Sequence, residues 1–245
     1  MMKVVATIET RMTSNRLPGK VLMPVAGITM LGCLVRRLKV VKSIDCIVLA
    51  TTVNKADDSL VDLAKELEIE AFRGDENDVM NRVIGAATSV GADIIVEITG
   101  DCPVIDPEIV EQTIQMFKAN SADYVSNAHI RSYPDGMDTQ VFRLDTLKRS
   151  AAMTDDLLDH EHVTLHIRNN PELFSQVHLV APPEIYWPEL GLTLDEYKDY
   201  EILKKIIEYF DETNPIFSCL DVVRLLRQNP EWVEINKAVV RKGDS

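Results

Sequence analysis

Runs rich in β-branched residues alternate with amphipathic segments along the first half of the chain. Lys3–Ile8, Cys46–Ala50 and Ile94–Ile98 have the length and composition of buried strands. Between them, apolar residues recur every three or four positions, as in Met30–Leu38 and Leu60–Leu67, and this spacing predicts helices. Strands that alternate with helices at this pitch imply right-handed βαβ crossovers. The pattern therefore predicts an α/β fold with a mostly parallel sheet and helices on both faces.

The alternation changes after about Asn127, where the turn-rich segment Ser132–Asp138 interrupts it. A long helix is predicted again over Tyr197–Phe210, and the tail from Lys237 is polar. Residues 1–245 are expected to form one domain, with 127–190 as an inserted arm for substrate binding or dimerisation. The remaining predicted elements are strands at Glu70–Phe72, Tyr124–Ser126, Gln140–Phe142 and Val177–Val180, and helices that start near Val79 and Pro107 or span Leu144–Met153, Glu161–Arg168 and Leu220–Arg227.

The chain is acidic, with 26 Lys and Arg against 39 Asp and Glu in 245 residues and a formal net charge of −13. A polyanion would be repelled on average, so binding to nucleic acid or to an anionic membrane surface is not expected. The four cysteines are scattered without a C-x-x-C pair, which argues against a disulfide framework or a structural zinc site. The apolar start is too short for a secretory segment, and no stretch approaches the ~20 apolar residues that span a bilayer. A cytoplasmic protein is predicted.

Positive charge gathers in the loop after the first predicted strand. Thr10–Lys20 contains no acid, and its Ser, Asn, Pro and Gly favour a non-helical path that presents backbone N–H groups. It is not a Walker A loop, because Gly19-Lys20 is followed by Val21, and it has no G-x-G-x-x-G pattern. A solvated loop paired with nearby acids is the alternative, but a position at the carboxyl end of a strand favours phosphate binding. The candidate phosphate ligands are Arg11, Arg16 and Lys20.

Two aspartates follow predicted strands or short apolar segments. Asp101 stands on a Gly-x-x-Pro turn directly after Ile94–Ile98, and Asp195 follows Leu192–Leu194. Mg²⁺ in proteins uses one or two carboxylates together with substrate phosphates and waters. Two acids and three cations are what a magnesium–nucleotide complex requires, because the acids hold the metal and the cations hold the phosphates. Taken singly, each aspartate could equally cap its own turn.

These motifs resemble those of one family. The run Arg11–Lys20 together with Thr99–Pro103 resembles the cytidylyltransferase family that includes acylneuraminate and 3-deoxy-manno-octulosonate cytidylyltransferases. The resemblance is strongest to the spore-coat polysaccharide biosynthesis subgroup. Further matching motifs, in the expected order over about Lys3–Phe210, are Phe72–Arg82, Asp123–Asn127, Asp135–Asp138, Glu161–Thr164 and Leu192–Asp195.

The resemblance implies a Rossmann-like fold of the nucleotide-diphospho-sugar transferase type that binds CTP and Mg²⁺, and a homodimer is expected. It also assigns residues to three groups. The nucleotide would be bound by Arg11, Ser14, Arg16, Lys20, Arg82, Thr99 and Gly100, of which Arg11, Arg16 and Lys20 are catalytic candidates together with Asp101. The acceptor would contact Asp135, Asp138, Gln140 and His162, and Mg²⁺ would be held by Asp101 and Asp195.

Two positions depart from the subgroup's pattern. Thr13 stands where a glycine is usual, and its Cβ makes close backbone approach to a phosphate harder. Glu97 stands where an arginine is common, so a negative charge replaces a positive one. This second change affects either a contact with the acceptor or a structural pair.

The implied reaction is the Mg²⁺-dependent transfer of CMP from CTP to a sugar acid or to a small phosphate or phosphonate, with release of pyrophosphate, in surface-glycan biosynthesis. A hydroxyl acceptor would require a base, for which Asp138 and His162 are candidates. Three alternatives stay open: UTP or GTP in place of CTP, a glycosyltransferase that uses a finished sugar nucleotide, and a non-catalytic nucleotide-binding homologue. The glycosyltransferase is disfavoured because Asp101-Cys102-Pro103 lacks the second adjacent acid that such enzymes usually carry.

Overall fold

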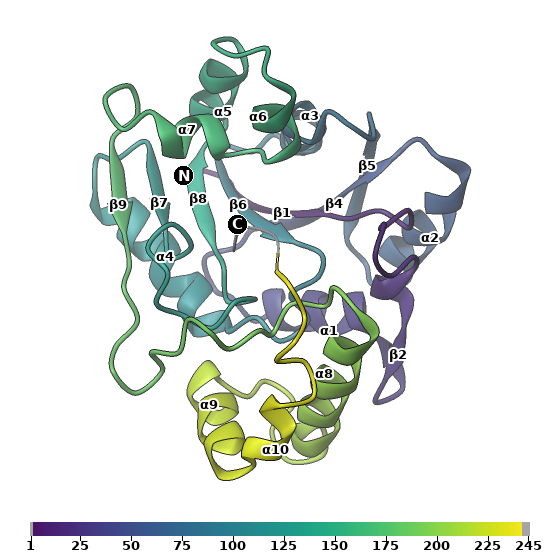
Figure 1. Ribbon diagram of the computed structural model, residues 1–245. Coiled ribbons are helices and arrows are strands. Elements are labelled where there is room, and N and C mark those ends of the chain that lie inside the picture. Colours follow the sequence, from purple (N-terminus) through teal and green to yellow (C-terminus); the bar gives the residue numbers. More distant parts are fainter. Residues whose placement is uncertain (1, 242–245) are drawn as a thin grey trace.

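A seven-stranded sheet runs through the middle of the molecule, of which the computed structural model describes residues 2–241 (Figure 1). Its strands are β1 (Val4–Glu9), β4 (Cys46–Thr52), β5 (Glu70–Gly74), β6 (Ile94–Thr99), β7 (Tyr124–Ser126), β8 (Gln140–Arg143) and β9 (Gln176–His178). They are arranged in the order β5-β4-β1-β6-β8-β7-β9, and β8 runs antiparallel to both of its neighbours while the other pairs are parallel. The predicted α/β fold with a mostly parallel sheet is confirmed.

Helices cover both faces of this sheet because side chains alternate along each strand. In β1, Val4, Ala6 and Ile8 belong to the core shared with α1, α2 and α4, whereas Val5 belongs to the core shared with α3, α5 and α7. The helices are α1 (Met30–Leu38), α2 (Asp58–Glu66), α3 (Val79–Ser89), α4 (Pro107–Ala119), α5 (Leu144–Ala151), α6 (Leu157–Glu161), α7 (Leu165–Asn169), α8 (Tyr197–Phe210), α9 (Cys219–Gln228) and α10 (Pro230–Val233). Short 3₁₀ helices lie at η1 (Lys20–Leu22) and η2 (Lys55–Asp57), and β2 (Pro24–Val25) pairs with β3 (Ile28–Thr29).

A third core lies beyond the sheet, between α1, α8 and α9. Ile202 and Ile206 of α8 pack in one cluster with Met30 and Cys33 of α1 and Val222 of α9. Figure 1 shows α8, α9 and α10 together at the lower end of the molecule, from where the chain turns back toward the sheet. None of the helices in the described part of the chain has the length and apolar character needed to cross a membrane.

The segment 127–190 contributes to the main sheet as well as to its covering. β8 and β9 pair inside the seven-stranded sheet, and α5 and α7 cover one of its faces. The single helix predicted over Glu161–Arg168 is wrong: α6 ends at Glu161 and α7 begins at Leu165. Between them Val163 adopts a positive φ of 39°, which interrupts the helix. In this conformation its side chain is buried in the core formed with α3 and α5. The role of this segment as an arm for the acceptor or for dimerisation stays a prediction.

Candidate active site

The site lies where the strand order reverses, between β1 and β6. Glu9 at the end of β1 is the register partner of Thr99 at the end of β6, so the two following loops leave the same edge of the sheet. A Cβ on Gly100 would lie 2.6 Å from the Cβ of Thr10, so the close approach of these loops requires a glycine at this position. Ligands of open parallel sheets bind in the crevice at such a switch point.

Lys20 is the centre of the site. Its Nζ lies 3.0 Å from Asp101 Oδ2 and 3.0 Å from Asp195 Oδ1. The sequence places these two aspartates far apart, yet the backbone N–H of Leu194 donates to the Asp101 carbonyl at 2.8 Å and joins their segments directly. The structure therefore brings the predicted phosphate ligand and both predicted metal ligands to one point.

The opposite charges in this ion-pair cluster outweigh the cost of burying them. Only 10% of the Lys20 side chain is exposed, and burial alone would lower its pKa, but the charges of Asp101 and Asp195 outweigh burial and raise the pKa of Lys20 above its usual range. Burial would raise the pKa of Asp101, but the charge of Lys20 together with hydrogen bonds from Lys20 and Thr99 outweighs burial and lowers that pKa. Lysine and aspartate are thus both charged at neutral pH.

Arg16 joins the same cluster from the first loop. Its Nη2 lies 2.7 Å from Asp195 Oδ1, and its Nη1 donates to the backbone carbonyl of Val240 at 2.8 Å. Arg16 and Lys20, the two cations at the end of the loop, therefore share one aspartate. Ser14 is half-buried on the same loop, and the Thr99 hydroxyl lies 3.2 Å from the Cys102 Sγ.

The other two predicted nucleotide ligands point elsewhere. Arg11 Nη1 donates to the Glu76 carbonyl at 3.1 Å, and Arg82 Nη1 donates to the carbonyls of Asp75 at 2.6 Å and Glu76 at 3.2 Å. Burial lowers the pKa of Arg82, and its Nε is buried without a hydrogen-bond partner. The cations thus form two groups, Arg16 with Lys20 and Arg11 with Arg82, rather than one cradle around Lys20.

A buried carboxylate holds the first loop in place. Asp57 is fully buried and accepts from the Met12 backbone N–H at 2.8 Å and from the side chains of Thr51 at 2.9 Å and Thr52 at 2.5 Å. Burial would raise its pKa, but these hydrogen bonds lower it, so Asp57 remains charged and rigidly bound. It anchors the start of the cationic loop to the end of β4.

Two of the predicted acceptor residues, Asp135 and Asp138, lie on the segment leading into β8. Arg131 Nη1 lies 3.4 Å from Asp135 Oδ1 and 3.6 Å from Asp138 Oδ2. Burial raises the pKa of both carboxyl groups, with that of Asp138 reaching about 7, to which the charge of Asp135 also contributes. Asp138 can therefore exchange a proton near neutral pH.

The other two acceptor candidates are less suited to binding. The Gln140 carbonyl oxygen accepts from Tyr124 Oη at 2.5 Å and Thr164 Oγ1 at 2.6 Å, while its amide donates to Glu97. Both polar atoms of the Gln140 side chain are therefore hydrogen-bonded within the protein. His162 is exposed at the end of α6, and within residues 2–241 its side chain forms no hydrogen bond with Asp135, Asp138 or Gln140.

Both departures from the family pattern have structural partners. Thr13 Oγ1 donates to Glu76 Oε1 at 2.6 Å, which ties the first loop to the segment after β5. Glu97 is buried and accepts from the Gln140 amide. Burial, and then the charge of Glu97, raise the pKa of Glu9 well above its usual range. Glu97 is thus part of a structural pair within the sheet.

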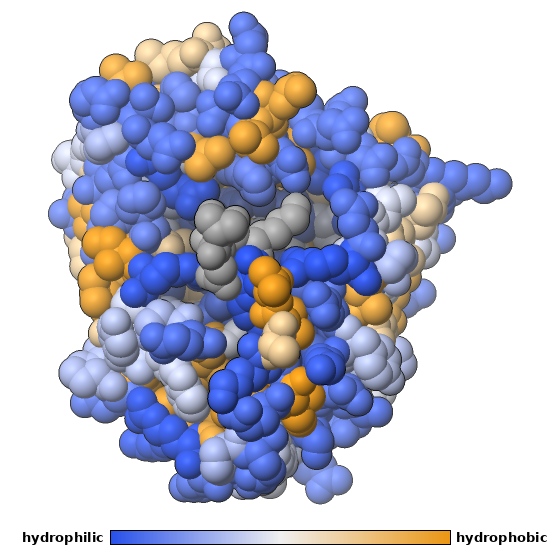
Figure 2. All heavy atoms as spheres, in the orientation of Figure 1, coloured by the Kyte–Doolittle hydropathy of each residue, from blue (hydrophilic) through white to orange (hydrophobic). Residues whose placement is uncertain are grey.

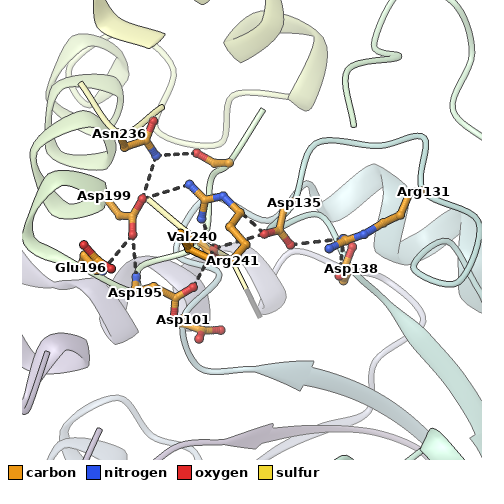
Figure 3. A network of polar contacts seen from close by, with 12 residues as sticks. Asp101, Arg131, Asp135, Asp138, Asp195, Glu196, Asp199, Asn236, Val240 and Arg241 are labelled. Atoms are coloured by element: carbon orange, nitrogen blue, oxygen red, sulfur yellow. Dashed lines mark hydrogen bonds and ion pairs between the residues drawn. The ribbon is translucent and has the colours of Figure 1, made fainter. Parts of the chain in front are cut away.

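Two further residues belong to the site although sequence reasoning missed them (Figure 3). Asp199 is fully buried, and its Oδ2 accepts from the backbone N–H groups of Asp195 at 3.1 Å and Glu196 at 2.8 Å. Its position three residues after Glu196, at the start of α8, is a capping-box signal that could have pointed to it. Arg241 reaches the site from the polar tail, where no sequence pattern marks it.

The donor set suits Mg²⁺ only in company with a substrate. Within residues 2–241, no group of three or more His, Cys, Asp or Glu side chains is arranged to hold a metal ion. The carboxylates of Asp101 and Asp195 nevertheless converge on one cation, the Lys20 ammonium. Two carboxylates fit an ion that takes its other ligands from phosphates and water.

Comparison with known proteins agrees with this geometry. The cytidylyltransferase family pattern matches residues 5–237. The spore coat polysaccharide biosynthesis protein SpsF of Bacillus subtilis is 34% identical over 231 residues, which cover 91% of this chain and 94% of that protein.

Solved structures show the same relationship. A cytidylyltransferase from Leptospira borgpetersenii superposes with a TM-score of 0.92 at 33% identity, covering 98% of this chain and all of that one. A CMP:2-keto-3-deoxy-manno-octonic acid synthetase solved with CTP shares the fold at 19% identity, with a TM-score of 0.65 over 84% of this chain and 99% of its own. The chain is a nucleotidyltransferase that belongs to the cytidylyltransferase family.

Proposed function

We propose that this protein is a Mg²⁺-dependent cytidylyltransferase that moves CMP from CTP to a sugar acid or to a small phosphate or phosphonate, releasing pyrophosphate. Membership of the family supports the transfer of a nucleotide. The name of the Bacillus subtilis relative supports a place in surface-polysaccharide biosynthesis. On the face shown in Figure 2, hydrophilic residues predominate, as suits charged substrates.

One observation carries this proposal: the Lys20 ammonium lies between the carboxylates of Asp101 and Asp195. A divalent cation would replace the ammonium between these carboxylates. Lys20 would then be free to hold the triphosphate, and Arg16 would exchange Asp195 for a phosphate oxygen in the same way. The ion pairs of the ligand-free protein thus supply the contacts for the magnesium–nucleotide complex.

In the proposed reaction, an acceptor oxygen attacks the α-phosphorus of CTP in line. A new P–O bond forms, and the bond from the α-phosphorus to the bridging oxygen breaks, so pyrophosphate leaves with the electron pair. Bound Mg²⁺ would supply charge neutralisation for the triphosphate. Lys20 and Arg16 hold the phosphates in position and stabilise the charge that develops on the leaving group.

Asp138 is the proposed base for a hydroxyl acceptor. Its pKa of about 7 suits proton transfer at neutral pH, and a third of its side chain is exposed, which gives an acceptor access to it. His162, the other candidate, is exposed at the end of α6. A phosphate or phosphonate acceptor would need no base.

The proposed base predicts a pH dependence. The pKa of Asp138 is raised to about 7, so the carboxyl is protonated below that pH and becomes a base above it. With a hydroxyl acceptor, log kcat/KM should rise with pH below about 7 and level off above it. Asp138→Asn should lower the rate by about 10²- to 10⁴-fold and remove the rise. Asp145 is exposed, and the control variant Asp145→Asn should keep the parent's rate and its rise with pH. An unchanged pH profile in Asp138→Asn would reject Asp138 as the base.

The proposed function is tested by pyrophosphate release. Purified protein is incubated with MgCl₂, one of CTP, UTP, GTP or ATP, and a panel containing 3-deoxy-manno-octulosonate, an acylneuraminate and small phosphates and phosphonates. We expect pyrophosphate only with CTP and one acceptor class, together with a CMP-linked product in the mass spectrum. CTP with MgCl₂ should also raise the melting temperature more than the other nucleotides, because a ligand that binds only the native state stabilises it. Pyrophosphate release with UTP or GTP instead would overturn the assignment of CTP as the substrate. If no nucleotide bound at all, the proposed transferase activity would be rejected.

A further inference from the structure

The last described residues of the chain return to the active site. After α10 the chain runs back from the lower helices toward the end of β6 (Figure 1). We call Val239, Val240 and Arg241 the C-terminal strap. Val240 is held by Arg16 of the cationic loop, whose Nη1 donates to the Val240 carbonyl at 2.8 Å. The strap therefore lies against Arg16, one of the predicted nucleotide ligands.

Arg241 reaches into the site between two aspartates (Figure 3). Its Nη2 lies 3.0 Å from Asp199 Oδ1, its Nε lies 3.7 Å from Asp135 Oδ2, and its Nη1 donates to Thr193 Oγ1 at 2.6 Å. Only 10% of its side chain is exposed. The guanidinium of Arg241 is thus held by three polar side chains.

A glycine makes room for this guanidinium. A Cβ on Gly191 would lie 1.8 Å from Arg241 Cζ and 1.8 Å from its Nη2, far inside van der Waals contact. Gly191 is also paired with Asp135 in an isolated parallel β-bridge. The guanidinium of Arg241 therefore lies where the segment with the predicted acceptor residues meets the segment before Asp195. Any side chain at this position would displace the guanidinium.

Two sets of hydrogen bonds connect Arg241 with Asp195. The Thr193 hydroxyl accepts from Arg241, so its own proton is directed to a carboxylate, either Asp195 Oδ2 at 3.2 Å or Asp135 Oδ2 at 3.4 Å. Asp199, held by Arg241 through Oδ1, binds the Asp195 backbone N–H through Oδ2 at 3.1 Å. Arg241 thereby constrains both the side chain and the backbone of Asp195.

We propose that Arg241 is a positioning residue for Asp195 and Asp135, and that the C-terminal strap completes the metal–nucleotide site. This inference rests on the proposed function, because Asp195 is there a magnesium ligand. Groups that orient a metal ligand without touching the metal commonly change metal affinity by about 10- to 100-fold. Loss of Arg241 frees the Asp195 carboxylate to adopt other orientations, and metal binding weakens.

The experiment uses the full chain and calorimetry with CTP and MgCl₂. In Arg241→Ala we expect the Mg²⁺ concentration that half-saturates CTP binding to rise about 10-fold, whereas CTP binding without Mg²⁺ changes little. Gly191→Ala keeps the arginine but displaces its guanidinium, so it should reproduce this rise. The double variant should be no worse than either single one, because both remove the same contact. Lys237→Ala, whose exposed side chain pairs with Glu234 at 2.7 Å, is the control and should behave as the parent protein.

The outcomes separate this inference from the proposed function. A parent protein that binds no CTP with MgCl₂ would overturn the proposed function and this inference together. A parent that binds while both variants keep its Mg²⁺ dependence would overturn the inference alone. Equal weakening of CTP binding with and without Mg²⁺ would assign Arg241 a general structural role and also overturn it. Arg241→Lys keeps the positive charge but lacks the forked guanidinium, so it should need as much Mg²⁺ for half-saturation of CTP binding as Arg241→Ala. A return to the Mg²⁺ dependence of the parent protein would contradict the positioning role.

Discussion

Replacing Lys20 with alanine is expected to lower the rate of nucleotidyl transfer by about 10²- to 10³-fold, the usual cost of one preorganised charge that stabilises a leaving group. The Lys20 side chain contacts both Asp101 and Asp195. It follows Gly19 in a short 3₁₀ helix rather than in the central sheet, so the variant should remain folded. Steady-state pyrophosphate release and circular dichroism would measure the two effects.

The same variant should gain metal affinity in the absence of nucleotide. Without the ammonium, the carboxylates of Asp101 and Asp195 have lost their shared cation, and a divalent ion can take its place. Calorimetry with MnCl₂ alone should therefore show tighter binding to Lys20→Ala than to the parent protein. Lys42→Ala, on the surface, should change neither property. Normal turnover together with unchanged metal binding would refute the ion exchange on which the proposed function depends.

Asp101→Asn should reduce activity at least about 100-fold, because an amide of the same shape cannot supply the negative charge that a Mg²⁺ ligand provides. The backbone contact of Asp101 with Leu194 does not involve the side chain, so the turn should persist. Activity should recover in part as the Mg²⁺ concentration is raised. Asp195→Asn should behave alike, and the double variant should be only slightly worse, since residues that act as one unit are not additive.

The matched control for these variants is Asp62→Asn, which removes a carboxylate from an exposed ion pair on α2. It should leave the rate and its Mg²⁺ dependence unchanged, because surface ion pairs contribute little. If Asp101→Asn kept full activity with the parent's Mg²⁺ dependence, Asp101 would not be a metal ligand.

Local pattern was sufficient for most of the fold. β1 and β6 were predictable because each is an apolar run that the sheet buries on both faces, and α1 because its apolar positions recur at helical spacing. The helix predicted over Glu161–Arg168 failed because Val163 is buried in a left-handed conformation that no periodicity reveals. Tertiary burial outweighed helical propensity there.

The active site, like the fold, was only partly predictable from the sequence. The sequence by itself indicated that a cationic loop and an aspartate turn follow two strands of one parallel sheet, and the carboxyl ends of such strands share one edge. It predicted that Lys20 and Asp101 would meet, and the position of β1 beside β6 in the sheet brings them together. It did not determine which cations join them, because Arg11 and Lys20 stand on one loop yet pair with groups far apart in the chain.

Only the tertiary structure decided the rest. It directed Arg11 to Glu76, used the polar atoms of Gln140 within the protein, left His162 exposed and brought Arg241 from the tail to Asp199. Contacts between polar groups distant in sequence follow from the path of the whole chain, whereas hydrophobic periodicity reports only which face of each element is buried. A polar tail carries no such periodicity, so the place of Arg241 could be seen only once the chain had folded.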